Sequence, residues 1–302
     1  LSSKIAKAFE AETGIPVNVQ YGGTNVIVNR LIAERANPNA DVWYGGGGLL
    51  SFLFAKREGI TTPYVPPEFK DLPVQQGNVY LRDADWHFVG AEVFVIGFAY
   101  NPKTLPKEQA PRTWDDLLDP KWKGQIQMPN PAASGTATLS VLAQIMQVIR
   151  AGRTEKEAWE FWEKLNKNVS LYPESGAAPT RAVAKGDAKI GICFSFMPWG
   201  LAARGESVDF ILPAQTPVIA NPVALVKGSK RPENGKRLYD FILGVKGQQI
   251  LADYSQIVLN KKVKPTTPLS FEQVSRNAMP LDVDWAQANY DRIRNEWRGR
   301  FG

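Results

Sequence analysis

The sequence predicts an α/β fold of two lobes that are joined by two crossover segments. The chain has 302 residues, which is too many for one average domain. Short β-like runs alternate with amphipathic helical stretches in an early block and again in a middle block. Two segments, Val93–Pro102 and Phe210–Pro222, would connect these blocks. Two crossovers between α/β units are the plan of a hinged fold with a central cleft.

The early block predicts helices and strands in strict alternation. Its first helix, SKIAKAFEAETG, has Ile5 and Phe9 on one face and ends near Gly14. The elements that follow are the strand PVNVQYGG, the helix TNVIVNRLIAERAN, the strand ADVWYGGGG and the helix LLSFLFAKREGI. This spacing is typical of a parallel sheet with helices, and its first strand is expected before residue 1.

The middle block repeats the alternation after a polar, Pro-rich connection over residues 61–82. Its predicted elements include the strands in WHFVGAEVFVIGFAYNP, the long helix SGTATLSVLAQIMQVIRAG, the helix GAAPTRAVAKGD and the strand AKIGICFSF. The chain would then return through DFILPAQTPVIANPVALVKGS and end in helices. We therefore expect residues 1–98 and 216–302 to form lobe 1 and residues 99–215 to form lobe 2.

Composition narrows the possible functions. Hydrophobic residues make up 44% and charged residues 22%, and the longest apolar stretch is far shorter than the roughly 20 residues of a membrane span. One cysteine and one histidine exclude a disulfide framework and multi-His or Cys-cluster zinc sites. No Gly-x-Ser-x-Gly motif is present. The net charge of +6 comes from interspersed charges rather than a basic run, so we expect no nucleic-acid binding. Because these zinc and hydrolase patterns are missing, we also expect no metal, no cofactor and no catalysis.

Five segments resemble those of a known family and follow one another along the chain in the same order as in that family. They are KIAKAFEAETGIPV, ADVWYGGGG, TWDDLLDPKWKGQIQMPNPAASGTA, SGAAPTRAVAKGDAKIGI and PVIANPVALVKGSKRPENGKRLYDFIL. With these the chain resembles the type 2 periplasmic solute-binding proteins of ABC importers, in the branch of ferric-ion-binding, phosphosugar-binding and phosphonate-binding proteins. The resemblance implies a two-lobe type 2 periplasmic binding fold with a central cleft and a two-strand hinge. It also implies a monomer in the periplasm or outside the cell, with or without a lipid anchor, that delivers a small solute to a permease; a signal segment is expected upstream.

Two helix starts in lobe 2 are candidate anion sites. The first contains Ser134, Gly135 and Thr136, and the second contains Ser175, Gly176 and Ala177. The first N–H groups of a helix have no intrahelical partner, and the helix dipole adds partial positive charge there. The alternative is a plain N-cap, because Ser and Thr are favoured at that position.

Two glycine-rich loops of lobe 1 are candidate contacts from the opposite side. The residues are Gly23, Thr24 and Asn25 in the first loop and Tyr44, Gly45 and Gly46 in the second. Glycines allow tight turns that expose N–H groups to a ligand. Thr24 or Asn25 is equally suited to cap the helix that follows, and the four-glycine run is also compatible with a flexible loop.

The segment CFSFMPWG decides between metal and organic ligands. In ferric-binding relatives this region supplies adjacent tyrosines, whereas this chain has Phe194, Ser195 and Phe196. Ser195 and Trp199 are candidate contacts for an organic ligand, or else Trp199 packs in the core. Asn221, held extended by Pro222, either faces the cleft or shapes the crossover.

The sequence therefore favours capture of a small organic anion, one that bears phosphate or phosphonate such as a sugar phosphate. One alternative is a ferric ion held without tyrosines or through a bound anion. Another is an enzyme on the same fold, similar to a thiaminase-like transferase, with Cys193 as nucleophile. Its apolar neighbours favour a buried, inert Cys193 instead.

Overall fold

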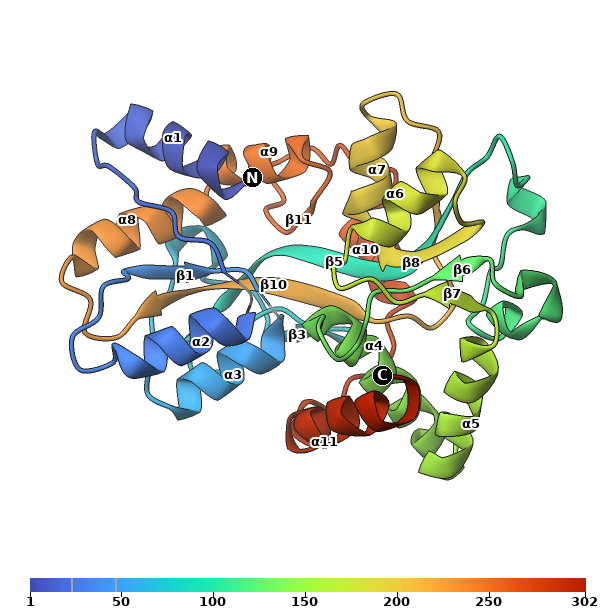
Figure 1. Cartoon of the computed structure of the whole chain (residues 1–302). Helices are drawn as coiled ribbons and strands as arrows, with labels where there is room; N and C mark the ends of the chain where they lie inside the picture. Colours follow the sequence, from blue (N-terminus) through green and yellow to red (C-terminus); the bar gives the residue numbers. More distant parts are fainter. Residues whose placement is uncertain (23, 47) are drawn as a thin grey trace. The chain divides into compact units, whose positions relative to one another are not determined.

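Helices and strands alternate along most of the chain in the computed structural model, which describes residues 1–22, 24–46 and 48–302 (Figure 1). The described chain divides into two compact units. Unit 1 consists of Leu1–Val93 and Ile219–Phe271, and unit 2 consists of Phe94–Val218 and Glu272–Gly302. The chain thus changes unit at three places: within the strand β5 (Val89–Tyr100), at the start of β10 (Val218–Val226) and at the start of α10 (Phe271–Arg276).

Unit 1 contains the predicted alternation of the early block, followed by elements that return late in the chain. Its helices are α1 (Ser2–Thr13), α2 (Thr24–Ala33), α3 (Leu49–Arg57), the short 3₁₀ turn η1 (Pro67–Phe69), α8 (Pro232–Leu243) and α9 (Val245–Asp253). Its strands, besides parts of β5 and β10, are β1 (Val42–Tyr44), β2 (Thr61–Thr62), β3 (Gln75–Gln76), β4 (Val79–Tyr80) and β11 (Ile257–Val258).

The strand pairs described in unit 1 are antiparallel, which differs from the parallel sheet that the sequence predicted. β1 and β2 both pair with β10, and β11 pairs with β5. The predicted strand over residues 16–22 does not form. Within this segment Val17 donates its N–H to Oε1 of Glu10 on α1 at 2.5 Å. Alternating hydrophobicity provides no hydrogen-bonding partner by itself, and here α1 supplies one instead of a neighbouring strand.

Unit 2 contains the middle block together with the C-terminal helix. Its helices are η2 (Lys107–Gln109), η3 (Asp115–Leu118), η4 (Pro120–Trp122), α4 (Gly135–Arg150), α5 (Glu155–Asn166), α6 (Ala178–Lys185), α7 (Phe196–Ala202) and α11 (Val283–Phe301). Its strands, besides most of β5, are β6 (Ile126–Gln127), β7 (Val169–Leu171), β8 (Ile190–Phe194) and β9 (Asp209–Ile211).

The sheet of unit 2 has a parallel part that orients the loops of interest. β6 pairs with both β7 and β8 in parallel, and β8 and β9 pair with β5 antiparallel. The carboxyl ends of β6, β7 and β8 therefore lie at one edge of the sheet. In open α/β sheets this edge is where ligands bind.

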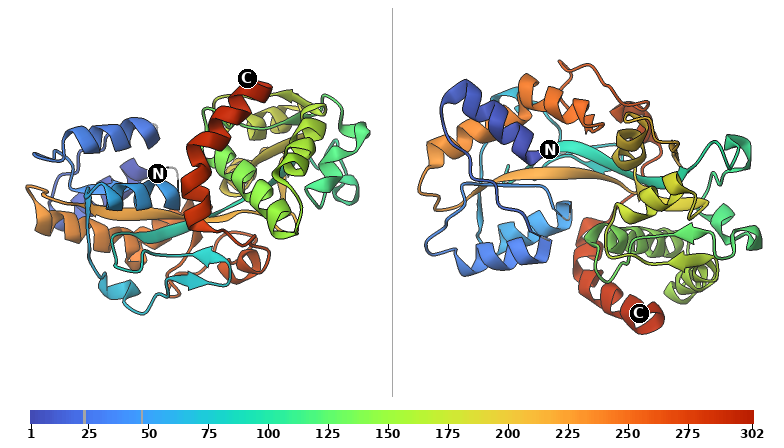
Figure 2. Two further views of the ribbon diagram at one scale, coloured as in Figure 1. Left: turned by 90° about the horizontal axis from the view of Figure 1, so that it is seen from below. Right: turned by 45° about the horizontal axis from the view of Figure 1, so that its top comes forward.

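The C-terminal helix α11 belongs to unit 2, whereas the sequence assigned residues 216–302 to lobe 1. Figures 1 and 2 show α11 beside α4. Trp297 is almost completely buried, and its ring lies 5.3 Å from that of Trp162 and 5.5 Å from that of Tyr172. This burial of a large aromatic ring explains why the helix packs here.

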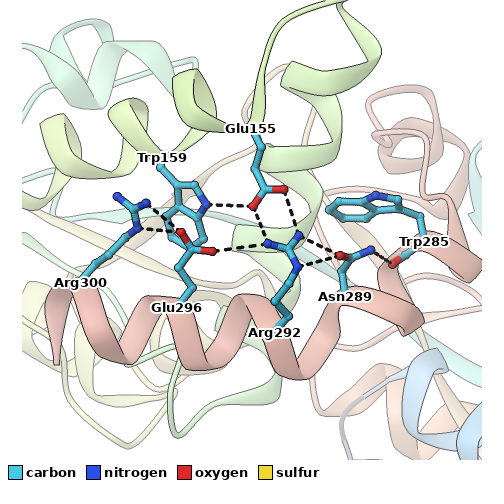
Figure 3. Close-up of polar contacts among 7 residues, drawn as sticks. All are labelled: Glu155, Trp159, Trp285, Asn289, Arg292, Glu296 and Arg300. Carbon is cyan, nitrogen blue, oxygen red and sulfur yellow. Dashed lines mark hydrogen bonds and ion pairs between the residues drawn. The ribbon is translucent and has the colours of Figure 1, made fainter.

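Ion pairs at the rim of this packing join α11 to α5 (Figure 3). Arg292 donates to both carboxylate oxygens of Glu155 at 2.8 and 3.0 Å, and Arg300 donates to Glu163 at 2.8 Å. Glu296 links the two arginines along α11. Such exposed pairs add little stability each, so the buried tryptophan is the main attachment. No helix within the described ranges is long and apolar enough to span a membrane.

Candidate functional site

The loops after β6, β7 and β8 bring together the predicted site residues of unit 2. The first loop leads to Ser134, the second contains Ser175 and Gly176, and the third begins at Ser195. A backbone hydrogen bond from the N–H of Asn130 to the carbonyl of Pro173, 2.9 Å long, ties the first loop to the second. Residues far apart in sequence thus share one sheet edge because their strands are parallel neighbours.

The start of α4 is capped by a side chain, which agrees with the alternative that this segment is an N-cap. Ser134 is its N-cap residue and accepts a hydrogen bond from the N–H of Ala137 at 3.4 Å. Gly135 and Thr136 are the first two residues of the helix. The side chain of Ser134 is half-buried, and its O–H can still donate, because capping uses only the oxygen as acceptor. Capping and ligand contact are therefore compatible at this residue.

The start of α6 has no side-chain cap. Its N-cap residue is Ala177, which has no side-chain acceptor, and Pro179 lies in the first turn. Among the described residues, the N–H groups of Gly176 and Ala177 have no hydrogen-bond partner. Ser175 lies exposed just before them. These donors are free to bind an anion, as the first N–H groups of helices do.

A pocket in unit 2 joins the two helix starts. It encloses about 280 Å³, including space open to solvent, and both Ser134 and Gly176 line it. The rest of its lining is mainly apolar and includes Met128, Ile192 and Phe194. A few polar donors in an apolar setting are typical of small-molecule sites.

Ser195 and Trp199 are both buried in unit 2. Trp199 is 6% exposed, and its ring contacts that of Phe210 edge-on at 5.4 Å, so it contributes to the core of unit 2. Ser195 is almost completely buried, and its Oγ has no hydrogen-bond partner in the described part of the chain. Trp199 thus matches the core-packing alternative.

In unit 1, the loop that follows β1 lies against β10. Gly45 has φ 72° and Gly46 has φ 90°, values that favour glycine. The N–H of Gly45 donates to the carbonyl of Pro222 at 2.8 Å, and a Cβ on Gly45 would lie 3.1 Å from Nδ2 of Asn221. A Cβ on Gly46 would lie 3.4 Å from Oγ1 of Thr24, so the two predicted loops of this unit meet. Gly23 lies outside the described residues, and Asn25 is the second residue of α2.

A buried carboxyl group beneath this loop is a feature that the sequence analysis missed. Oε1 of Glu92 accepts hydrogen bonds from Oη of Tyr44 at 2.8 Å and from Nδ2 of Asn221 at 2.6 Å. Glu92 is 1% exposed, and its Oε2 has no partner among the described residues. Burial raises the pKa of Glu92 to about 7. The available signal was a single acid within the apolar run GAEVFVIGFAY.

Comparison with known proteins identifies the family. The model of the bacterial extracellular solute-binding proteins matches residues 38–289, most of the chain. This chain belongs to that family. The resemblance to periplasmic solute-binding proteins found in the sequence is thereby confirmed.

The descriptions of individual relatives of this solute-binding protein mention different ligands. The periplasmic binding protein AfuA from Actinobacillus pleuropneumoniae, solved with exogenous fructose-6-phosphate bound, is 28% identical; the match covers 99% of this chain and 94% of that one, with a TM-score of 0.82. The putative 2-aminoethylphosphonate-binding periplasmic protein of Salmonella typhimurium is 28% identical over 82% of this chain and 70% of its own. Iron uptake protein A1 of Synechocystis is 28% identical over 95% of this chain and 81% of its own.

These matches extend the conclusion from family to role. The protein has the mixed α/β fold of the two-lobe periplasmic binding proteins, and it is a periplasmic solute-binding protein of an ABC transporter. The named relatives are substrate-binding transport proteins. The descriptions of these relatives refer to a sugar phosphate, a phosphonate and iron uptake, so the family alone leaves the chemistry of the solute open.

Proposed function

We propose that this solute-binding protein captures a small organic anion that bears a phosphate or phosphonate group, such as a sugar phosphate, and delivers it to a permease. The observation that carries the proposal is the pair of helix starts on one pocket of unit 2. Ser134 offers a hydroxyl, and Gly176 and Ala177 offer N–H groups without partners among the described residues. Donors of this kind at helix N-termini match the oxygens of a phosphoryl group.

The relatives support this ligand class. AfuA was solved with a sugar phosphate, and the Salmonella protein is named for a phosphonate. Both compounds combine a tetrahedral oxyanion with a small organic part. A carboxylate would also accept these hydrogen bonds, so the thermal-shift panel below includes dicarboxylates.

Iron is the main alternative, because one relative is named as an iron uptake protein. The segment Phe194-Ser195-Phe196 joins β8 to α7, and neither phenylalanine offers an oxygen ligand. Within the described ranges no group of three or more His, Cys, Asp or Glu side chains could hold a metal ion. We therefore favour the organic anion over a ferric ion.

Catalysis by Cys193 is disfavoured by its surroundings. The side chain is buried, and burial raises the pKa of its thiol to about 12. Because the thiolate is the nucleophile, a thiol that remains protonated at neutral pH is unreactive. This supports capture of a solute rather than its turnover.

A thermal-shift panel tests the proposal. Sugar phosphates, alkylphosphonates, dicarboxylates, polyamines and ferric salts are each added to the intact chain, since a ligand that binds the folded state raises the melting temperature. We expect the largest rise with phosphates or phosphonates. A rise with ferric salts alone, in the absence of any organic anion, would overturn the proposal.

A further inference from the structure

Three phenylalanine rings meet beside the candidate anion site. Phe94 lies on β5, Phe194 ends β8, and Phe196 begins α7. The ring centroids of Phe94 lie 5.1 Å from Phe194 and 4.9 Å from Phe196, and those of Phe194 and Phe196 are 5.7 Å apart. We call this group the phenylalanine cluster. All three residues belong to unit 2.

The register of the strands explains why two of the rings share a face. Phe194 pairs with Ile96 in the antiparallel pair of β8 and β5. Phe94 is two residues from Ile96, and residues two apart on a strand project to the same side of the sheet. Ile96 and Phe194 both line the pocket. Phe94 therefore lies on the same face of the sheet as these two lining residues and contacts the ring of Phe194.

Exposure separates the cluster from the core around it. Every residue of β5 is buried except Phe94, and every residue of β8 is buried except Phe194. Phe196 is also half-buried. A single partly exposed apolar residue needs no explanation, but three partly exposed aromatic rings in mutual contact next to a pocket form an apolar surface that a ligand can cover.

The cluster is continuous with the anion donors. Phe194 lines the same pocket as Ser134 and Gly176, and the side chain of Met197, next to Phe196, lies 3.7 Å from a Cβ built on Gly176. The one residue between Phe194 and Phe196 is the uncharged Ser195. A solute held by its anionic group at the helix starts would place its organic part on these rings.

We propose that the solute carries an apolar, ring-sized group that packs on Phe94, Phe194 and Phe196 while its anionic group is held at the starts of α4 and α6. This inference rests on the proposed function and specifies its ligand. An open-chain polyol would cover the same rings with hydroxyl groups that find no partner there, so we expect it to bind more weakly than an anion that presents a ring with an apolar face.

Calorimetric titration of matched pairs tests the inference. The pairs are methylphosphonate with phenylphosphonate, and glycerol 3-phosphate with phenyl phosphate. Burying one ring at about 25 cal/mol per Å² predicts that the aryl member binds about 10-fold to 100-fold more tightly. Its binding should also show a more negative heat-capacity change.

Variants assign the preference to the cluster. Phe194→Ala and Phe94→Ala should each reduce the affinity ratio of the aryl to the small anion by at least about fivefold. Phe194→Leu keeps most of the apolar volume and serves if the alanine variant unfolds; it should reduce the ratio less. Phe161→Ala is the matched control, because Phe161 is also half-buried but lies on α5 and contacts Trp162. It should leave the ratio unchanged.

Two outcomes overturn the inference, and they are distinguishable. Equal affinity within each pair, or a preference that survives in the Phe94 and Phe194 variants, contradicts the apolar group but leaves anion capture intact. No binding of either member of any pair at millimolar concentration contradicts the proposed function itself.

Discussion

The candidate contacts in the two units differ in how their polar groups are used. In unit 1, Asn221 and Tyr44 both donate to the buried Glu92, and the N–H of Gly45 is bonded to the carbonyl of Pro222. In unit 2, the N–H groups of Gly176 and Ala177 have no partner among the described residues, and the hydroxyl of Ser134 keeps a donor. The polar groups of unit 1 are used in hydrogen bonds that hold a loop in place, whereas those of unit 2 are free to bind a ligand. Substitutions should therefore affect stability in unit 1 and affinity in unit 2.

The largest expected effect concerns the pH dependence of Glu92. Its pKa is about 7 in the folded protein against an ordinary value of 4.5, so the folded state holds a proton that the unfolded chain has lost. This contribution to stability is fully present below about pH 4.5 and is lost as the pH rises to about 7, an effect of up to about 3 kcal/mol. Glu92→Gln cannot ionise, so denaturant unfolding from pH 5 to 8 should show the wild type losing stability relative to this variant.

Glu157 provides the matched control for this titration. Hydrogen bonds from the backbone and side chain of Thr154 hold the pKa of Glu157 at about 2. Glu157 is ionised in both the folded and unfolded states above about pH 6, so Glu157→Gln should differ from the wild type by a nearly constant amount between pH 6 and 8. A wild-type stability that stays parallel to that of Glu92→Gln would contradict the buried protonated carboxyl.

The next largest effect is expected for Ser134→Asp. Aspartate is as good an N-cap as serine, so α4 should remain stable. The added carboxylate repels an anion and removes a donor, which predicts a loss of affinity of about 100-fold or more, since a hydrogen bond to a charged group contributes about 1.5–3 kcal/mol. Calorimetry with the best ligand of the thermal-shift panel measures it. Thr154→Asp changes the N-cap of α5 in the same way and should leave affinity unaltered. Unchanged binding by Ser134→Asp would mean that Ser134 is only a cap.

Asn221→Ala should lower stability by about 2 kcal/mol, because it removes a donor from a buried carboxyl group. Tyr44→Phe removes the other donor with little change in volume and should cost about 1 kcal/mol. Both donors share Oε1 of Glu92, so the double variant should be non-additive in urea unfolding. Additive losses would argue against one shared cluster.

The smallest effect is expected for Ser175→Ala. The side chain is exposed and makes no hydrogen bond with the described residues, so stability should change by less than about 0.5 kcal/mol. Loss of a neutral donor to the anion predicts affinity about fivefold weaker. If Ser175→Ala destabilised the protein without weakening binding, unit 2 would resemble unit 1 and the contrast between them would fail.

The sequence by itself determined features whose causes are local. Ser134 was predicted as a helix start, and its side chain caps α4 through a residue three positions away. The alternation of helices and strands was predicted from periodicity, and the family from five segments in order. These signals depend on neighbours within a few residues, so they can be found without knowing the fold.

Only the tertiary structure decided which distant segments meet. Parallel pairing of β6 with β7 and β8 brings Ser134, Gly176 and Phe194 to one pocket. The buried Trp297 assigns α11 to unit 2, and β10 returns late in the chain to place Asn221 against Glu92. These strand pairings join residues more than 40 positions apart, and the contacts of Trp297 and Asn221 join residues more than 100 positions apart. No local pattern specifies a partner at such distances. For this reason the sequence predicted the candidate donors of unit 2, but neither the ring cluster of unit 2 nor the buried acid of unit 1.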